Sequence, residues 1–60
     1  MRFTSEEAFD ASTRGEPYMM PRYWVENQVE AHGLFVRDIY DDLPWQTHYD
    51  AAVVLAWLGY

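Results

Sequence analysis

The chain contains no cysteine, and in a sequence of 60 residues this absence limits how a fold can be stabilised. Without cysteine there is no disulfide framework and no thiolate metal cage, the usual stabilising devices of very small domains. A domain of this length buries only about 60% of the surface that its unfolded chain exposes. Aromatic packing or self-association must compensate, and the chain has three Trp, five Tyr and three Phe, each of which buries roughly 150–250 Å². We therefore expect a single domain over residues 1–60.

The charge of the chain is strongly unbalanced. Ten Asp and Glu face four basic residues, all of them arginine, for a formal charge of -6, although half of the residues are hydrophobic. A disordered acidic tail would lack that apolar and aromatic content. An acidic domain is repelled by nucleic-acid phosphates and by anionic lipid, so we expect neither direct nucleic-acid binding nor membrane binding. Its expected partners are basic protein surfaces.

The N-terminal residues do not have the pattern of a secretory signal. Glu6 and Glu7 come early, and no apolar stretch of signal-peptide length precedes them. The longest uninterrupted apolar run covers the eight residues 51–58, whereas a membrane span needs roughly 20. We expect a soluble protein of the cytoplasm.

A first helix is predicted at residues 5–13. Thr4 and Glu7 have the spacing of a capping box, in which the threonine side chain accepts from the Glu7 amide while Glu7 reaches back to Thr4. Phe3 and Ala8 have the spacing of a hydrophobic staple across that helix start. Gly15, with a proline at position 17, predicts the end of the helix.

The middle of the chain allows two interpretations. After a connector at 17–21 that is bounded by prolines, residues 22–30 alternate with a period close to two, and residues 34–40 are rich in aromatic and β-branched side chains, which favours a hairpin that turns near 31–33. The alternative is helical, because Val29, Val36 and Ile39 also fall at helical spacing. Gly33 would cost the interior of a helix about 1 kcal/mol relative to alanine. We favour the hairpin.

A second helix is predicted at residues 48–58, with Thr47 and Asp50 as its capping pair and Gly59 as its stop. This helix is apolar nearly all round, so either the helix at 5–13 or a second subunit must cover it. A homodimer through Val54 and Leu55 is therefore one expectation. The predicted fold class is α+β in the order α-β-β-α, with a short hairpin or a three-stranded sheet whose third strand lies near 45–47.

The residue types that carry catalysis or bind metals do not form a recognisable pattern. His32 and His48 have no zinc-binding spacing, and each is explained by a turn or a helix start. Asp41 and Asp42 are adjacent, but the spaced acids and central glycine of a calcium loop are missing. We expect no catalytic residue, no metal and no cofactor, and thus no enzyme.

The remaining signal is a subset of the acidic residues. If the hairpin interpretation holds, one surface gathers the candidate partner-binding residues Glu26, Glu30, Asp38, Asp41, Asp42 and Trp24. Carboxylates at phosphate-like intervals can occupy a groove built for nucleic acid and meet the Arg and Lys that normally contact DNA. The alternative is that these acids form a solvated face that only keeps the protein soluble, because a net charge of this size is ordinary for a small domain.

In its length, acidity, aromatic content and lack of catalytic residues, the whole chain resembles the small acidic anti-CRISPR proteins of bacteriophages, in particular inhibitors of the type I-C system. The resemblance implies a DNA mimic that acts in the bacterial cytoplasm, binds a Cas subunit and blocks target DNA engagement. Two alternatives remain open. One is a homodimeric structural or regulatory module, and the other is an inhibitor of a different host protein that binds nucleic acid, such as a restriction enzyme or RNA polymerase.

Overall fold

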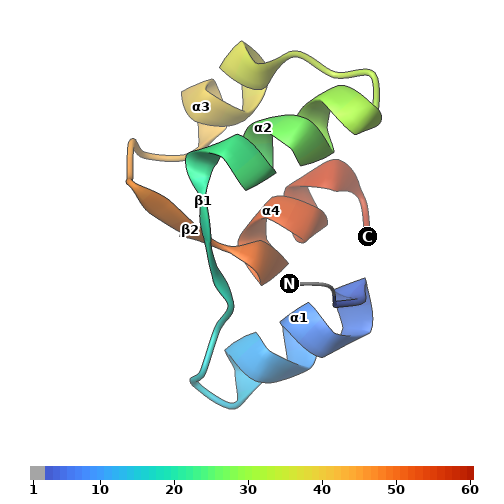
Figure 1. The fold of residues 1–60 in the computed structure, drawn as a ribbon, viewed down its shortest axis with the longest axis vertical. Coiled ribbons are helices and arrows are strands. Elements are labelled where there is room, and N and C mark those ends of the chain that lie inside the picture. The colour runs from blue at the N-terminus through green and yellow to red at the C-terminus, as the bar shows by residue number, and fades with distance from the viewer. Residues whose placement is uncertain (1–2) are drawn as a thin grey trace.

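A computed structural model describes residues 3–60 and shows an α+β fold (Figure 1). Its elements are, in chain order, α1 (Ser5–Thr13), β1 (Met19–Pro21), α2 (Arg22–Ala31), α3 (Val36–Asp42), β2 (His48–Asp50) and α4 (Ala51–Leu58). The predicted fold class is confirmed. The order of helices and strands differs from the predicted one, because the chain between the two expected helices contributes two further helices.

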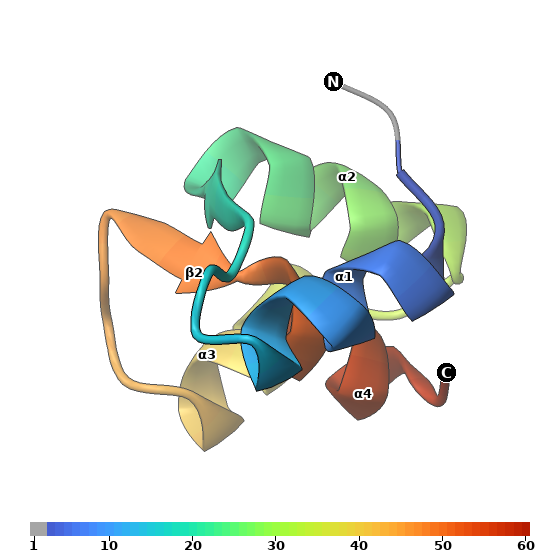
Figure 2. The same ribbon diagram turned by 90° about the horizontal axis from the view of Figure 1, so that it is seen from below.

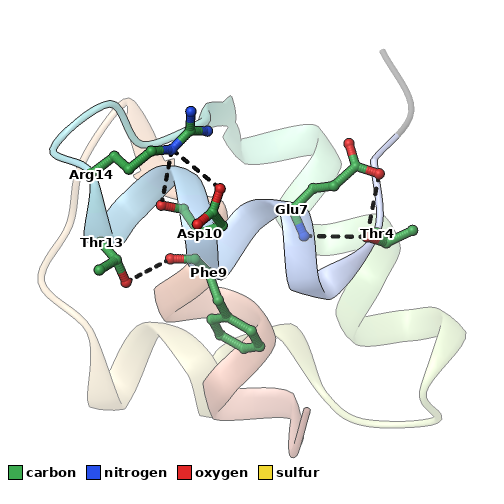
Figure 3. Close-up of polar contacts among 6 residues, drawn as sticks. All are labelled: Thr4, Glu7, Phe9, Asp10, Thr13 and Arg14. Carbon is green, nitrogen blue, oxygen red and sulfur yellow. Dashed lines mark hydrogen bonds and ion pairs between the residues drawn. The ribbon is translucent and has the colours of Figure 1, made fainter.

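The first helix has the bounds that the sequence predicts. The Thr4 side chain accepts a hydrogen bond from the Glu7 amide at 3.2 Å, as a capping box requires. The Glu7 carboxylate does not reach the Thr4 backbone and instead accepts from the Thr4 hydroxyl at 3.3 Å. Close to the other end, Arg14 forms an ion pair with Asp10 at 3.2 Å (Figure 3). Gly15 then takes a φ of 81°, a left-handed conformation that suits glycine after a helix.

The hairpin predicted for residues 22–40 is wrong, and the helical alternative is correct. Val25 and Val29 on α2 and Ile39 on α3 are all fully buried. The two valines are four residues apart, so a helix places both on one face. Burial of this face stabilises the helix more than the alternating pattern of the sequence favours a strand. The helical stretch is broken at Gly33, whose φ of 73° separates α2 from α3.

The sheet consists of two strands that are distant in sequence. β1 and β2 pair antiparallel, with Met20 opposite Tyr49 and Pro21 opposite His48. Neither strand lies where the hairpin was expected, since β1 belongs to the predicted connector and β2 lies just after the third strand expected near 45–47. Pro21 ends β1 and is also the N-cap of α2, a position where its missing N–H is tolerated.

The last helix begins three residues later than predicted, because residues 48–50 form β2. Asp50, and not Thr47, is its N-cap, and the Asp50 carboxylate accepts from the Ala52 amide at 2.9 Å. The same carboxylate accepts from the Ser12 hydroxyl at 2.8 Å, which ties α4 to α1. Gly59 ends the helix with a φ of 105°, as expected.

Two buried clusters form the core, and α4 belongs to both. Val54 packs in the first cluster with residues from α2, α3 and β2, whereas Leu55 packs in the second with Ala8 of α1 and Ala51. Figure 1 shows α4 between α1 and α2, and Figure 2 shows α1 passing across α4. The side of α4 that carries Val54 and Leu55 is therefore covered within one chain, whereas Val53 is exposed. Val54 and Leu55, the residues considered for a dimer interface, are buried in that interior.

None of the helices within residues 3–60 combines the length and the apolar character needed to cross a membrane.

Candidate protein-binding surface

Three of the five candidate acids lie together on one side of α3. Asp38, Asp41 and Asp42 are exposed, and their spacing of three and four residues places them on one helix face. Ile39, which lies among them in the chain, is fully buried in the first cluster. We call these three residues the α3 acidic face. Their grouping depends on the helix, because a strand would have placed Asp41 and Asp42 on opposite sides.

The arginines of the described chain leave this face unpaired. Arg14 forms its ion pair with Asp10 on α1, and this is the ion pair found within residues 3–60. The Arg22 guanidinium stacks over the Trp45 ring at 3.9 Å from its centre. The Arg37 guanidinium lies 5.3 Å from the centre of the Phe35 ring. Asp42 has one neutral partner, the Trp57 indole N–H, which donates to its carboxylate at 2.6 Å.

The acids of α2 belong to a different environment. The Tyr40 hydroxyl donates to the Glu26 carboxylate at 3.0 Å, which joins α3 to α2. Burial raises the pKa of the Tyr40 phenol above its ordinary value, the Glu26 carboxylate raises it further, and the Arg22 guanidinium opposes both effects. Glu30 is exposed one turn after Glu26. Glu26 therefore has a structural partner, whereas Glu30 is free to meet solvent.

The five acids do not form the single patch expected from the hairpin. Tyr40 faces α2 through its bond to Glu26, and Asp42 faces α4 through its bond to Trp57. Tyr40 and Asp42 are two residues apart, so on a helix with 3.6 residues per turn their side chains point in directions about 160° apart. The α2 acids and Asp42 thus lie on different sides of α3. The candidate acidic binding surface is therefore reduced to the three residues of the α3 acidic face.

Trp24 does not border the acidic surface either. Its ring is half-buried and packs against both core clusters, and its centre lies 5.7 Å from that of Phe3. Together with Gln28 and Tyr60, these two rings line an open cavity of about 480 Å³ near the start of α1. The role of Trp24 in the structure is to join α2 to the N-terminal segment.

The exposed aromatic residues beside the acids are ones that the sequence reasoning missed. Phe35 is the N-cap of α3, Trp45 follows the end of that helix by three residues, and each is 65% exposed. Trp45 is held between the Arg22 guanidinium and the Tyr40 ring, whose centre is 5.7 Å away. The available signal was a tryptophan between Pro44 and a run of polar residues.

The two histidines contact residues that do not form a metal site. His32 bonds to the Gln28 carbonyl at 2.8 Å and to the Tyr60 hydroxyl at 3.1 Å. His48 lies 3.3 Å from the Thr47 hydroxyl. Within residues 3–60, no group of three or more potential metal ligands is gathered in one place.

Comparison of the chain with protein-family models, with curated proteins and with solved structures finds no match. What the surface can bind is therefore inferred from its geometry and charge.

Proposed function

We propose that this protein is an acidic phage inhibitor that acts in the bacterial cytoplasm. It binds a basic, nucleic-acid-binding surface of a host defence complex, a Cas subunit, and blocks the engagement of target DNA. The binding residues are the α3 acidic face, with Asp38, Asp41 and Asp42 as the carboxylates that take the place of phosphates. No chemistry is required, because occupation of the DNA site is sufficient for inhibition.

The observation that carries this proposal is an acidic face without a basic partner, on a helix that exposed aromatic residues precede and follow in the chain. Three carboxylates lie between Phe35, at the start of α3, and Trp45, just beyond its end. Carboxylates without internal cation partners keep their full attraction for Arg and Lys on another protein. Aromatic residues are enriched in the buried centres of protein interfaces.

The dimensions of the face fit a short piece of DNA. Asp38 and Asp42 are four residues apart, and a rise of 1.5 Å per residue separates them by about 6 Å along the helix. Duplex DNA carries one negative charge per 1.7 Å of its axis, so 6 Å corresponds to roughly three or four charges. The α3 acidic face presents three. It therefore suits a mimic of a few base pairs, such as the short motif beside a target site, more than a mimic of extended duplex.

A pair of matched triple variants tests the proposal. One variant neutralises the α3 acidic face as Asp38→Asn, Asp41→Asn and Asp42→Asn. The control neutralises three exposed acids of α1 as Glu6→Gln, Glu7→Gln and Asp10→Asn. Each replaces three carboxylates, so the formal charge of both changes from -6 to -3. Asn at position 42 keeps an oxygen that can accept from Trp57.

The assay is competition between the protein and labelled target DNA for a purified type I-C effector complex. We expect the α3 variant to lose inhibition and the α1 control to keep most of it. Inhibition by the wild type should weaken as salt rises, since exposed charges are screened over about 8 Å at physiological ionic strength. Full inhibition by the α3 variant would refute the proposal. The same assay with a restriction enzyme and with RNA polymerase distinguishes the other host targets.

A further inference from the structure

The second cavity of the molecule is an apolar groove between the segment after α3 and the start of α4. It has a volume of about 290 Å³. Its walls are largely apolar and come from four parts of the chain, namely Met19 of β1, Leu43 and Pro44 after α3, Tyr49 of β2 and Val53 of α4. We call it the Val53 groove. A cavity at the low end of the size range of ligand sites suits one side chain better than a cofactor.

Two of the apolar residues that line this groove are exposed. Met19 is 50% exposed and Val53 is 45% exposed, although both belong to regular elements that pack on the core. Single exposed apolar residues are normal on protein surfaces, but apolar residues that share one hollow are characteristic of interaction sites.

Two carboxylates are associated with the groove. Asp50 lines it directly. Asp42 does not line it but precedes Leu43, which does, and accepts a hydrogen bond from Trp57, one helical turn beyond Val53 on α4. The Asp50 carboxylate already accepts from Ala52 and Ser12, and a carboxylate has about four acceptor positions, so further donors can still bind.

We propose that the Val53 groove receives one aliphatic side chain from a basic segment of the partner protein, with arginine or lysine on either side of that residue pairing with Asp42 and Asp50. The inference rests on the proposed function, because it identifies how the basic partner is held. Charge selects this occupant over a second copy of the chain. A symmetric dimer through the groove would place Asp42 and Asp50 of one copy against the same acids of the other, in a protein of charge -6.

The groove also explains how a small acidic face can distinguish its target from other basic proteins. Exposed charge pairs mainly accelerate and orient association, whereas a buried apolar side chain adds affinity that does not depend on salt. Full burial of an aliphatic side chain contributes enough for about a tenfold increase in affinity.

Two short peptides test the inference in the absence of an identified partner. The first has leucine between two pairs of arginines, and the second has serine in place of the leucine. Each is titrated into isotope-labelled protein while the methyl signals of the groove are followed by NMR. We expect the leucine peptide to bind about tenfold more tightly and to shift the signals of Met19, Leu43 and Val53.

The matched variants are Val53→Ser and Leu34→Ser. Leu34 is 42% exposed, close to the value for Val53, but it lies in the loop between α2 and α3 and does not line the groove. We expect Val53→Ser to abolish the preference for the leucine peptide and Leu34→Ser to retain it. Circular dichroism should show that both variants are folded.

Three results would overturn the inference. Equal affinity for the two peptides would mean that charge alone binds them, which leaves the proposed function intact and removes the groove from it. Binding of neither peptide would also exclude the groove as a docking site, while the DNA competition above decides separately about the acidic face. Dimerisation of the wild type that Val53→Ser reverses in sedimentation experiments would assign the groove to a second copy of the chain.

Discussion

Asp50 connects three elements of the fold, and its replacement by alanine has a consequence that can be calculated. The Asp50 carboxylate caps α4 through the Ala52 amide and accepts from the Ser12 hydroxyl of α1. Loss of an N-cap costs about 1 kcal/mol. Loss of the partner of the half-buried serine costs about another 1 kcal/mol. We expect Asp50→Ala to lower the free energy of unfolding by about 2 kcal/mol.

That change is large for a chain of this size. A 60-residue domain is expected to have a total stability of roughly 3–9 kcal/mol. For such a domain a loss of 2 kcal/mol lowers Tm by roughly 8–16 °C. Urea unfolding followed by tryptophan fluorescence, together with thermal unfolding followed by circular dichroism, would measure both quantities.

Two control variants separate the cap from other effects. Asp50→Asn keeps an oxygen that can accept from the Ala52 amide, and its N–H₂ group can donate to the Ser12 hydroxyl oxygen, so we expect it to remain within about 0.5 kcal/mol of the wild type. Thr47→Ala tests the cap expected from the sequence, and it should cost almost nothing because the Thr47 hydroxyl contacts only the His48 ring. The reasoning would be refuted if Thr47→Ala were as destabilising as Asp50→Ala, or if Asp50→Ala left the urea midpoint unchanged.

Two further outcomes follow from buried groups. Because the pKa of Tyr40 is raised in the folded protein, its contribution to stability is present below the ordinary tyrosine pKa of about 10 and is lost as the pH rises through the folded value. The difference in unfolding free energy between the wild type and Tyr40→Phe should therefore shrink with rising alkaline pH, and a constant difference would contradict the raised pKa of Tyr40. Val54→Ala should cost about 2 kcal/mol because Val54 is fully buried. In the same unfolding assay Val53→Ala should remain within about 0.5 kcal/mol of the wild type. Equal destabilisation by Val53→Ala and Val54→Ala would contradict the orientation of α4 described above.

The helix ends could be predicted because their signals are local. Thr4, Gly15 and Gly59 act within a few residues of the ends that they define, and all three have the predicted roles. The start of α4 was displaced for a reason that is not local. Residues 48–50 pair with residues 19–21, and no pattern in either segment indicates the other.

The middle of the chain was assigned to the wrong class because two signals compete there. Aromatic and β-branched residues favour strands, but Val25, Val29 and Ile39 are buried by helical geometry. Burial decides, since secondary-structure propensity is a weak prior that tertiary packing overrides. The same error affected the candidate surface. Asp38, Asp41 and Asp42 share a face only because residues 36–42 form a helix.

The candidate residues on α2 were misplaced for a related reason. Trp24 and Glu26 both have internal partners, in Phe3 and Tyr40, and contacts between segments distant in sequence cannot be read from composition. Trp45 was overlooked because a tryptophan in a short chain is expected in the core, whereas here Arg22 and Tyr40 hold it at the surface.

The membership of α4 in both core clusters has a consequence for synthesis in the cell. Residues 3–50 contain three helices, but Val54 and Leu55 are supplied only when α4 is complete. Until the ribosome has released residues 51–58, neither cluster can close, and the apolar faces of α1 and α2 remain in contact with solvent. The two clusters should therefore form nearly together, once α4 is available. A truncated product that ends at β2 should be a substrate for cellular proteases and not a partly active fragment.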